Sequence, residues 1–163
     1  MPQFPVNPHR LDPYKRFRFR VRWDGRVVAG VSRISGLRRR TDVVEYRQGT
    51  DPSTRKGPGR TTWEPVTLER GVTHDTAFED WANVVASAEG GMSLRNLRKD
   101  VVVELHNEAG QIVLAYLLYR CWPSAYQALP DLDADRSEVA FESLTLELEG
   151  WERDLGVTEP VET

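Results

Sequence analysis

The sequence predicts a mainly β protein, a small antiparallel β-barrel or sandwich with one helix docked on it. Segments with the two-residue periodicity of strands recur along the chain, separated by turn residues. Only one segment, about residues 75–88, has the apolar stripe of an amphipathic helix. A chain of 163 residues with 39% hydrophobic and 29% charged residues is large enough to bury one core. We therefore expect one domain of roughly seven strands and one helix.

The first strands form a hairpin. The stretch "YKRFRFRVRWDG" alternates apolar and basic side chains, the period of a half-buried strand. Asp24-Gly25 suits a two-residue turn with positive φ at both positions. The return strand is expected over 26–34, and a third strand over 39–47.

A long polar segment follows the third strand. Residues 49–59, "GTDPSTRKGPG", contain no apolar residue that could anchor them to a core. Loops of this length without structure of their own are usually functional or disordered. We predict an extended loop over 48–61 and a strand resuming at "TTWEPVTLER". Pro65 removes a backbone donor there, which places it at an edge or a bulge.

The helix is predicted in "THDTAFEDWANVVASAEGG", with Thr73 or Asp75 as its cap and Gly90-Gly91 at its end. A second hairpin covers "DVVVELHNEAGQIVLAYLLYRCWPSAYQ", with its turn at Asn107 to Gly110. Its arms are apolar on both faces in places, which is typical of strands buried on both sides or facing a partner. In the last strand, "EVAFESLTLELEGW", the apolar parity changes, and a bulge near Glu142-Ser143 would reconcile it.

The domain limits follow from composition. We expect an N-terminal arm over 1–11, the β domain over 12–151 and an acidic, frayed tail over 152–163. The N-terminus has no apolar run typical of a signal peptide, and the longest apolar run is too short for a membrane helix, so no membrane anchor is predicted.

No catalytic or cofactor motif emerges. Cys121 is alone, and His9, His74 and His106 lack ligand spacing, so neither a metal nor a cofactor is predicted. "RKGPGRTT" has its lysine before the glycines, unlike a phosphate-binding loop. "DLDAD" lacks the glycine of a calcium loop. We expect no enzyme.

The charges are segregated. Residues 10–40 hold eleven basic and two acidic residues, a net charge of +9, and residues 131–163 hold two basic and eleven acidic ones, a net charge of −9. Either the two ends fold against each other, or copies meet basic surface to acidic surface.

A basic row raises the possibility of nucleic-acid binding. The row comprises Arg16, Arg18, Arg20 and Arg22. Alternation places the neighbouring aromatic residues on the opposite face, where they form core rather than stacking platforms. The acidic overall balance also disfavours a dedicated nucleic-acid site, so a nucleic-acid-binding barrel is a minor alternative.

Several motifs in order carry a family resemblance, from "DPYKRFRFRV" through "TDVVEYRQGTDPSTRKGPG" and "VTLERGVTHDTAFEDW" to "PDLDADRSEVAFESLTLELEGW". Over about residues 12–151 the chain resembles the tail tube proteins of contractile phages, and still more the inner-tube proteins of phage-tail-like contractile injection systems. The resemblance implies a β-barrel with one helix that forms hexameric rings. These rings stack into a hollow tube, which sheath contraction drives through a target envelope.

The resemblance also implies partners and interface residues. The partners are further copies of the chain, a sheath protein, baseplate or spike and tube-cap proteins, and possible protein cargo in the lumen. The inter-subunit and ring-stacking loop would use Gln48, Asp51, Pro52, Ser53, Thr54, Arg55, Lys56, Pro58 and Arg60. The arginine row (16, 18, 20, 22) would face the lumen or the sheath, and Asp131, Asp133 and Asp135 would form an acidic stacking surface.

Three settings fit this resemblance. The chain is an injection-system tube protein, the tail tube protein of a contractile phage that conducts DNA, or an isolated-ring effector carrier of the type VI secretion kind. In the first two, assembly would occur in the bacterial cytoplasm before the tube becomes part of a particle. Arginine outnumbers lysine strongly, but composition does not separate the three settings.

Overall fold

The computed structural model describes residues 18–87 and 90–161, and within them it has ten strands and one helix. The elements are β1 (Arg18–Trp23), β2 (Arg26–Val27), β3 (Val31–Ile34), β4 (Arg39–Tyr46), β5 (Arg55–Trp63), β6 (Val66–Gly71), α1 (Ala77–Val85), β7 (Lys99–His106), β8 (Ile112–Gln127), β9 (Phe141–Glu147) and β10 (Gly150–Arg153). The mainly β fold with one helix is thereby confirmed. The predicted N-terminal arm over 1–11 lies outside the described residues.

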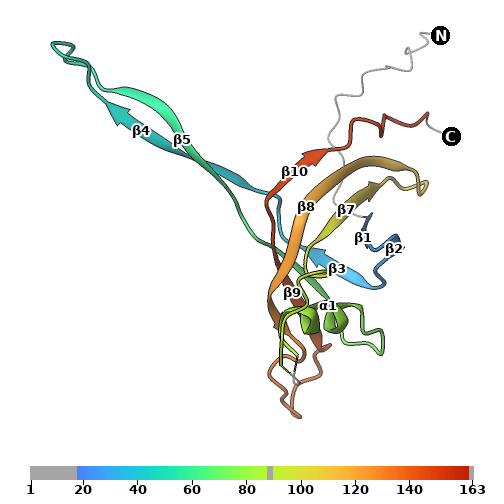
Figure 1. Ribbon diagram of the computed structural model, residues 1–163. Coiled ribbons are helices and arrows are strands. Elements are labelled where there is room, and N and C mark those ends of the chain that lie inside the picture. The colour runs from blue at the N-terminus through green and yellow to red at the C-terminus, as the bar shows by residue number, and fades with distance from the viewer. Residues whose placement is uncertain (1–17, 88–89, 162–163) are drawn as a thin grey trace, which may run out of the picture.

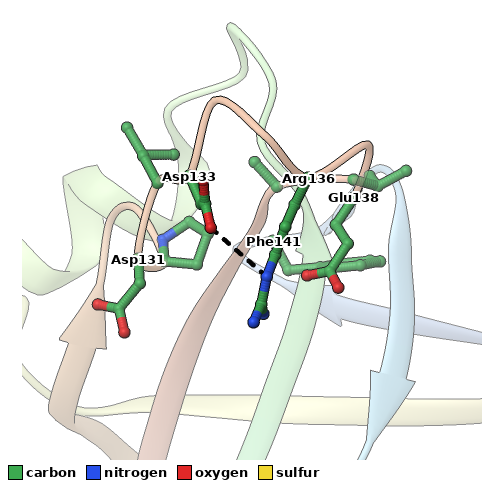
Figure 2. A pocket seen from close by; sticks show the side chains of 9 residues that line it. Asp131, Asp133, Arg136, Glu138 and Phe141 are labelled. Atoms are coloured by element: carbon green, nitrogen blue, oxygen red, sulfur yellow. Dashed lines mark ion pairs between the residues drawn. The ribbon is translucent and has the colours of Figure 1, made fainter.

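One curved sheet forms the body of the molecule. Its strand order is β2-β1-β7-β8-β9-β6-β3, β10 pairs with β8, and every pairing is antiparallel. The sheet wraps into an open barrel, whereas β4 and β5 form a separate two-stranded sheet that projects away from it (Figure 1). Residues 128–140 connect β8 to β9 at the end of the barrel where α1 lies, as Figure 1 shows and Figure 2 enlarges.

The barrel turns its corner in β8. One part of this 16-residue strand pairs with β7 and the other with β9. Near the end of the part that pairs with β7, at a register shift, Arg120 adopts a φ of 52°, and its backbone N–H donates to the Asp100 carboxylate at 3.0 Å. An irregular residue of this kind bends a strand and increases its twist. It allows a single strand to serve both halves of the barrel.

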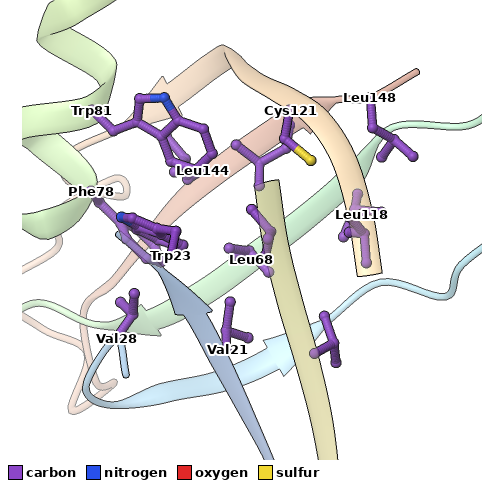
Figure 3. Close-up of a cluster of buried hydrophobic side chains, with 14 residues drawn as sticks. Val21, Trp23, Val28, Leu68, Phe78, Trp81, Leu118, Cys121, Leu144 and Leu148 are labelled. Carbon is purple, nitrogen blue, oxygen red and sulfur yellow. The ribbon is translucent and has the colours of Figure 1, made fainter. Parts of the chain in front are cut away.

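The core lies between the sheet and α1. Figure 3 shows Trp23, Phe78, Trp81, Leu118 and other apolar side chains gathered on the inner face. Phe78 and Trp81 bring the apolar stripe of α1 against Trp23, with ring centroids 6.0 and 4.9 Å away. The Trp81 indole N–H donates to the Leu97 carbonyl at 3.0 Å, so the large ring is buried without an unpaired donor. Each such side chain contributes about 1.5–3 kcal/mol through burial.

The turn predictions are confirmed in two hairpins. Asp24 and Gly25 adopt φ angles of 54° and 71°, the positive values expected for the first hairpin. Asn107 opens the second turn, where its side-chain oxygen accepts hydrogen bonds from the N–H groups of Ala109 and Gln111. These turns fix the registers of β1 with β2 and of β7 with β8.

Some predicted boundaries are wrong. The return strand over 26–34 is two strands, β2 and β3, because Gly30 turns the chain with a φ of 75°. The strand predicted over 61–70 is interrupted at Glu64-Pro65, so Pro65 lies in a break between β5 and β6. Divisions of this kind account for the ten observed strands, where about seven were expected.

The helix is shorter than the predicted 75–88. It begins at Ala77 after Thr76 and ends at Val85, before Gly90, and residue 88 lies outside the described residues. Neither predicted cap residue is the one that precedes the helix. The Asp75 carboxylate does accept from the Ala77 N–H at 3.0 Å, so it still satisfies a donor of the first turn.

The predicted bulge near Glu142-Ser143 is also wrong. The register of β9 with β6 is continuous, from Phe141 opposite Gly71 to Leu146 opposite Val66. Phe141 is exposed, and Glu142 points inward with the buried leucines of β9. The parity mismatch arises because a charged residue occupies a core position. Glu142 accepts a hydrogen bond from the fully buried Arg70 guanidinium, which neutralises it there.

Candidate assembly interface

The outstanding surface feature is the hairpin of β4 and β5, residues 39–63, called the arm below. Its strands pair only with each other among the described residues, from Arg39 opposite Trp63 to Tyr46 opposite Arg55. Every β4 residue is exposed, including Val43 at 65% and Tyr46 at 51%. The arm therefore extends from the barrel with apolar side chains and both outer backbone edges uncovered (Figure 1).

The root of the arm is held by aromatic packing. Trp63 meets Trp151 edge to face, with ring centroids 5.2 Å apart. The Arg39 guanidinium carbon lies 5.6 Å from both ring centroids, a cation–π arrangement. The Glu64 N–H donates to the Arg38 carbonyl at 3.0 Å and closes the base of the hairpin. These contacts fix the direction in which the arm leaves the barrel.

The tip of the arm is organised by Asp51. Its carboxylate accepts hydrogen bonds from the Ser53 hydroxyl and N–H and from Arg55 at 3.0 Å. The Ser53 side-chain hydrogen bond, with the other two, lowers the pKa of Asp51 below its ordinary value. The turn consequently has a defined shape despite its polar composition.

The boundaries predicted for the loop over 48–61 are wrong. Gln48, Asp51, Pro52, Ser53 and Thr54 lie in the turn at the tip, whereas Arg55, Lys56, Pro58 and Arg60 belong to β5. A Cβ on Gly59 would come within 2.9 Å of the Val44 side chain and 3.2 Å of the Asp42 carbonyl. Only glycine permits this close approach of the two strands, which lies beside the register shift between Thr41 and Val43. The glycines of this segment therefore fit a strand, although they interrupt the alternation by which a strand is usually predicted.

The arginine row lies on the outer face of β1. Phe19, Val21 and Trp23 point into the core, and Arg18, Arg20 and Arg22 take the other face. There Arg22 Nε contacts Glu104 Oε1 at 2.8 Å, and His106 Nε2 lies 3.4 Å from Glu104 Oε2. Arg16 lies outside the described residues. The predicted lumen or sheath orientation of this row stays a prediction.

The acidic residues lie in the connection of residues 128–140, called the β8–β9 loop below. Together with Phe141 this loop lines a hollow of about 450 Å³ (Figure 2). Asp131 and Asp133 lie at its edge, with Asp133 3.5 Å from Arg136, whereas Asp135 belongs to the same loop but is not part of the lining. Exposed apolar residues lie beside these acids: Leu132, which no pattern in the sequence indicated, and Val139 and Phe141, which the sequence placed in the last strand. Their gathering around one hollow depends on how the loop folds, which periodicity does not show.

The described parts of the two oppositely charged ends form no ion pairs with each other. Among the described residues, no ion pair joins the basic positions of 18–40 to the acidic positions of 131–161. Arg22 pairs with Glu104, and Arg33 lies 3.7 Å from Glu69. The folding-back alternative therefore finds no support in these residues.

The described residues offer little for catalysis. They contain no cluster of three or more His, Cys, Asp or Glu arranged to hold a metal. Burial raises the pKa of the Cys121 thiol to about 12, which makes it a poor nucleophile. No helix within residues 18–87 and 90–161 is long and apolar enough to cross a membrane.

Comparison with known proteins gives a consistent result. The sequence profile of the family described as "T4-like virus tail tube protein gp19" matches residues 15–152. A chain of the PVC sheath-tube complex of an extracellular contractile injection system is 25% identical over 87% of this chain and 91% of that one, with a TM-score of 0.73. A chain of the anti-feeding prophage tube-terminating cap is 26% identical over 92% and 98%, with a TM-score of 0.74.

A more distant likeness concerns the fold alone. Hcp1 from Flavobacterium johnsoniae is 14% identical over 88% of this chain and 100% of that one, with a TM-score of 0.52. No curated protein sequence gives a significant match.

Proposed function

The chain belongs to the T4-like virus tail tube protein gp19 family, and we propose that it is the inner-tube protomer of a phage-tail-like contractile injection system. The family and the fold are those of structural tube proteins. In the proposed assembly, copies form hexameric rings that stack into a hollow tube within a contractile sheath. The chain itself carries out no catalysis and acts through its shape and its contacts.

The observation that carries this proposal is the arm. A two-stranded hairpin is at best marginally stable on its own, and uncovered edges invite pairing with other chains. A neighbouring copy that covers the exposed Val43 and Tyr46 would satisfy both requirements. Residues 48–61, the predicted inter-subunit segment, comprise the tip of this arm and most of β5.

The complexes that contain the similar solved chains indicate the partners of this chain. The similar solved chains come from a sheath-tube complex and a tube-terminating cap. For this chain we infer a sheath around the tube, a baseplate or spike at one end and a cap at the other. Protein cargo in the lumen and assembly in the bacterial cytoplasm complete the proposal.

A shortened arm tests the function. Thr41 and Thr61 are paired, with hydroxyl oxygens 2.8 Å apart, so Asn-Gly can replace residues 42–60 as a two-residue turn. We expect a folded barrel with unchanged near-ultraviolet circular dichroism that forms no tubes by electron microscopy. The full-length chain, prepared identically, should form tubes.

The outcomes separate the alternatives. Tubes of full length from the shortened chain would contradict the role of the arm. Six-fold rings that never stack, from the unaltered chain, would indicate an isolated-ring carrier instead. A tube that retains DNA after nuclease treatment would indicate a phage tail.

A further inference from the structure

Another hollow, of about 310 Å³, lies at the root of the arm. It is bordered by the link from β3 to β4, by β7 and β8, and by β10, which lies beside the point where the arm leaves the barrel (Figure 1). Its lining is mostly apolar or aromatic: Ile34, Leu37, Val103, Leu105, Tyr116 and Trp151. Val103 belongs to the core, and the other five side chains pack against it. A concave, mostly apolar site of roughly 300–1,000 Å³ is typical of a small-ligand site.

The indole N–H of Trp151 supplies a hydrogen-bond donor at this hollow. Trp151 Nε1 is buried and has no hydrogen-bond partner within residues 18–87 and 90–161. A buried indole N–H usually has a partner, as Trp81 does in the carbonyl of Leu97. The rings of Trp63 and Tyr116 meet Trp151 edge to face, with centroids 5.2 and 5.9 Å away, and they hold the indole in place. An acceptor atom carried by a ligand would satisfy its donor.

Two arginines add positive charge beside the aromatic lining. The Arg39 guanidinium carbon lies 5.6 Å from the Trp151 ring centroid, and Arg153 Nη2 donates to the Tyr116 hydroxyl at 3.2 Å. Neither arginine forms an ion pair in the part of the chain that the structure describes. A guanidinium has five N–H donors, and their geometry matches a carboxylate. The charge and the unpaired indole donor therefore favour the same kind of ligand group.

From these observations we propose that the hollow binds a small apolar molecule that carries a carboxylate. The apolar body contacts Val103 and Leu105, and the carboxylate accepts hydrogen bonds from the Trp151 indole and the Arg39 guanidinium. The occupant packs on Trp151, whose contact with Trp63 fixes the direction of the arm. The site lies on the barrel of a single chain, so the inference does not depend on the tube function.

Equilibrium dialysis with radiolabelled octanoate tests the site on the full-length chain. Octanoate has both required parts, whereas acetate lacks the apolar body and octan-1-ol lacks the charge. We expect saturable binding of one octanoate per chain, and acetate should not displace it. Octan-1-ol should displace octanoate at least about tenfold less effectively than unlabelled octanoate does, because it forms no charge-assisted hydrogen bond with Arg39.

Variants of the lining separate the two parts of the ligand. Arg39→Gln removes the charge and should weaken octanoate binding about tenfold, with octan-1-ol binding unchanged. Trp151→Phe removes the donor, keeps an aromatic ring and should also weaken octanoate binding. Leu37→Trp fills the hollow and should abolish the binding of both molecules. Arg95→Gln removes an arginine from the connection between α1 and β7 and is the control, which should bind octanoate like the unaltered chain. Near-ultraviolet circular dichroism checks the fold of each variant.

Three results would overturn the site. Octanoate could show no saturable binding, acetate could displace it as well as unlabelled octanoate does, or Arg39→Gln and Trp151→Phe could both bind it like the unaltered chain. Each result would leave the tube function in place, because dialysis does not measure assembly. Failure of the chain to form tubes would, in turn, leave this site in place.

Discussion

The buried ion pair between Arg70 and Glu142 supplies the sharpest stability prediction. The Arg70 side chain is fully buried, and its Nε donates to Glu142 Oε1. Its Nη2 donates to the Asp75 carbonyl at 2.7 Å, and its guanidinium carbon lies 4.3 Å from the Phe78 ring centroid. The pair thereby links β6, β9 and the start of α1. The perturbation is Glu142→Gln, which removes the charge and keeps the shape.

The expected loss follows from the surroundings of the guanidinium. Removing one partner of a buried pair costs about 3–5 kcal/mol, because the other charge is left without compensation. Here the Asp75 carboxylate stays 3.3 Å from Arg70 Nη1, and a glutamine can still bond to Arg70 and to the Tyr126 hydroxyl. We therefore expect the lower part of the range, about 3 kcal/mol. For a domain of this size that lowers Tm by about 6–12 °C.

The assay is urea unfolding followed by tryptophan fluorescence, since Trp23 and Trp81 lie in the core. The arm-shortened chain serves as background, so that assembly does not add to the measured stability. Glu138→Gln, at an exposed position, is the control and should change the free energy of unfolding by less than about 0.5 kcal/mol. A loss below about 1 kcal/mol for Glu142→Gln would refute the reasoning. Replacing both partners, Arg70→Met with Glu142→Leu, should cost less than Glu142→Gln alone.

Three further predictions concern alkaline pH, salt and the arm. Burial raises the pKa of Cys121 from 9.0 to about 12, so above pH 9 the unfolded chain loses a proton that the folded chain keeps. Between pH 9 and 12 the free energy of unfolding should therefore fall by roughly 1.4 kcal/mol per pH unit. Urea titrations at several pH values should show this dependence in the unaltered chain and not in Cys121→Ala. Raising salt from 0.05 to about 1 M should shorten tubes in sedimentation assays, because exposed charges are screened; unchanged tubes would contradict charge-based stacking. Gly59→Ala should impair tube formation through its clash with Val44, whereas Gly57→Ala, with its nearest contact 3.8 Å away, should not.

The sequence predicted those elements whose neighbours along the chain determine them. Alternation places Val21 and Trp23 in the core, and Asp24-Gly25 supplies the turn that β1 and β2 require. The apolar stripe of α1 likewise identifies Phe78 and Trp81 as core residues. In each case the pattern and the local geometry agree, so no distant residue is needed to reach the conclusion.

Local patterns mislead where a residue distant in sequence determines the environment of a side chain. The sequence predicts a bulge near Glu142-Ser143, because Arg70, the partner that allows Glu142 to occupy a core position, is 72 residues away in sequence. The polar sequence of β5 predicts a loop, because strands usually have one buried face and the arm has none within a single chain. The acidic hollow depends on how the β8–β9 loop folds back on Phe141, which no periodicity encodes.

The arm differs physically from the barrel that supports it. Ordering a residue costs about 1–2 kcal/mol in backbone entropy, and the barrel offsets this cost by burying Trp81, Leu68 and their neighbours. The arm buries no comparable core: its described contacts are the hydrogen bonds between β4 and β5, a few exposed polar pairs such as Asp51 with Arg55, and the packing of Trp63 on Trp151 at its root. Its outer half must obtain the remaining stabilisation from other copies. If the proposed assembly holds, the barrel folds before assembly and the arm gains its remaining stabilisation in the tube, which would couple the ordering of the arm to the contacts that build the particle.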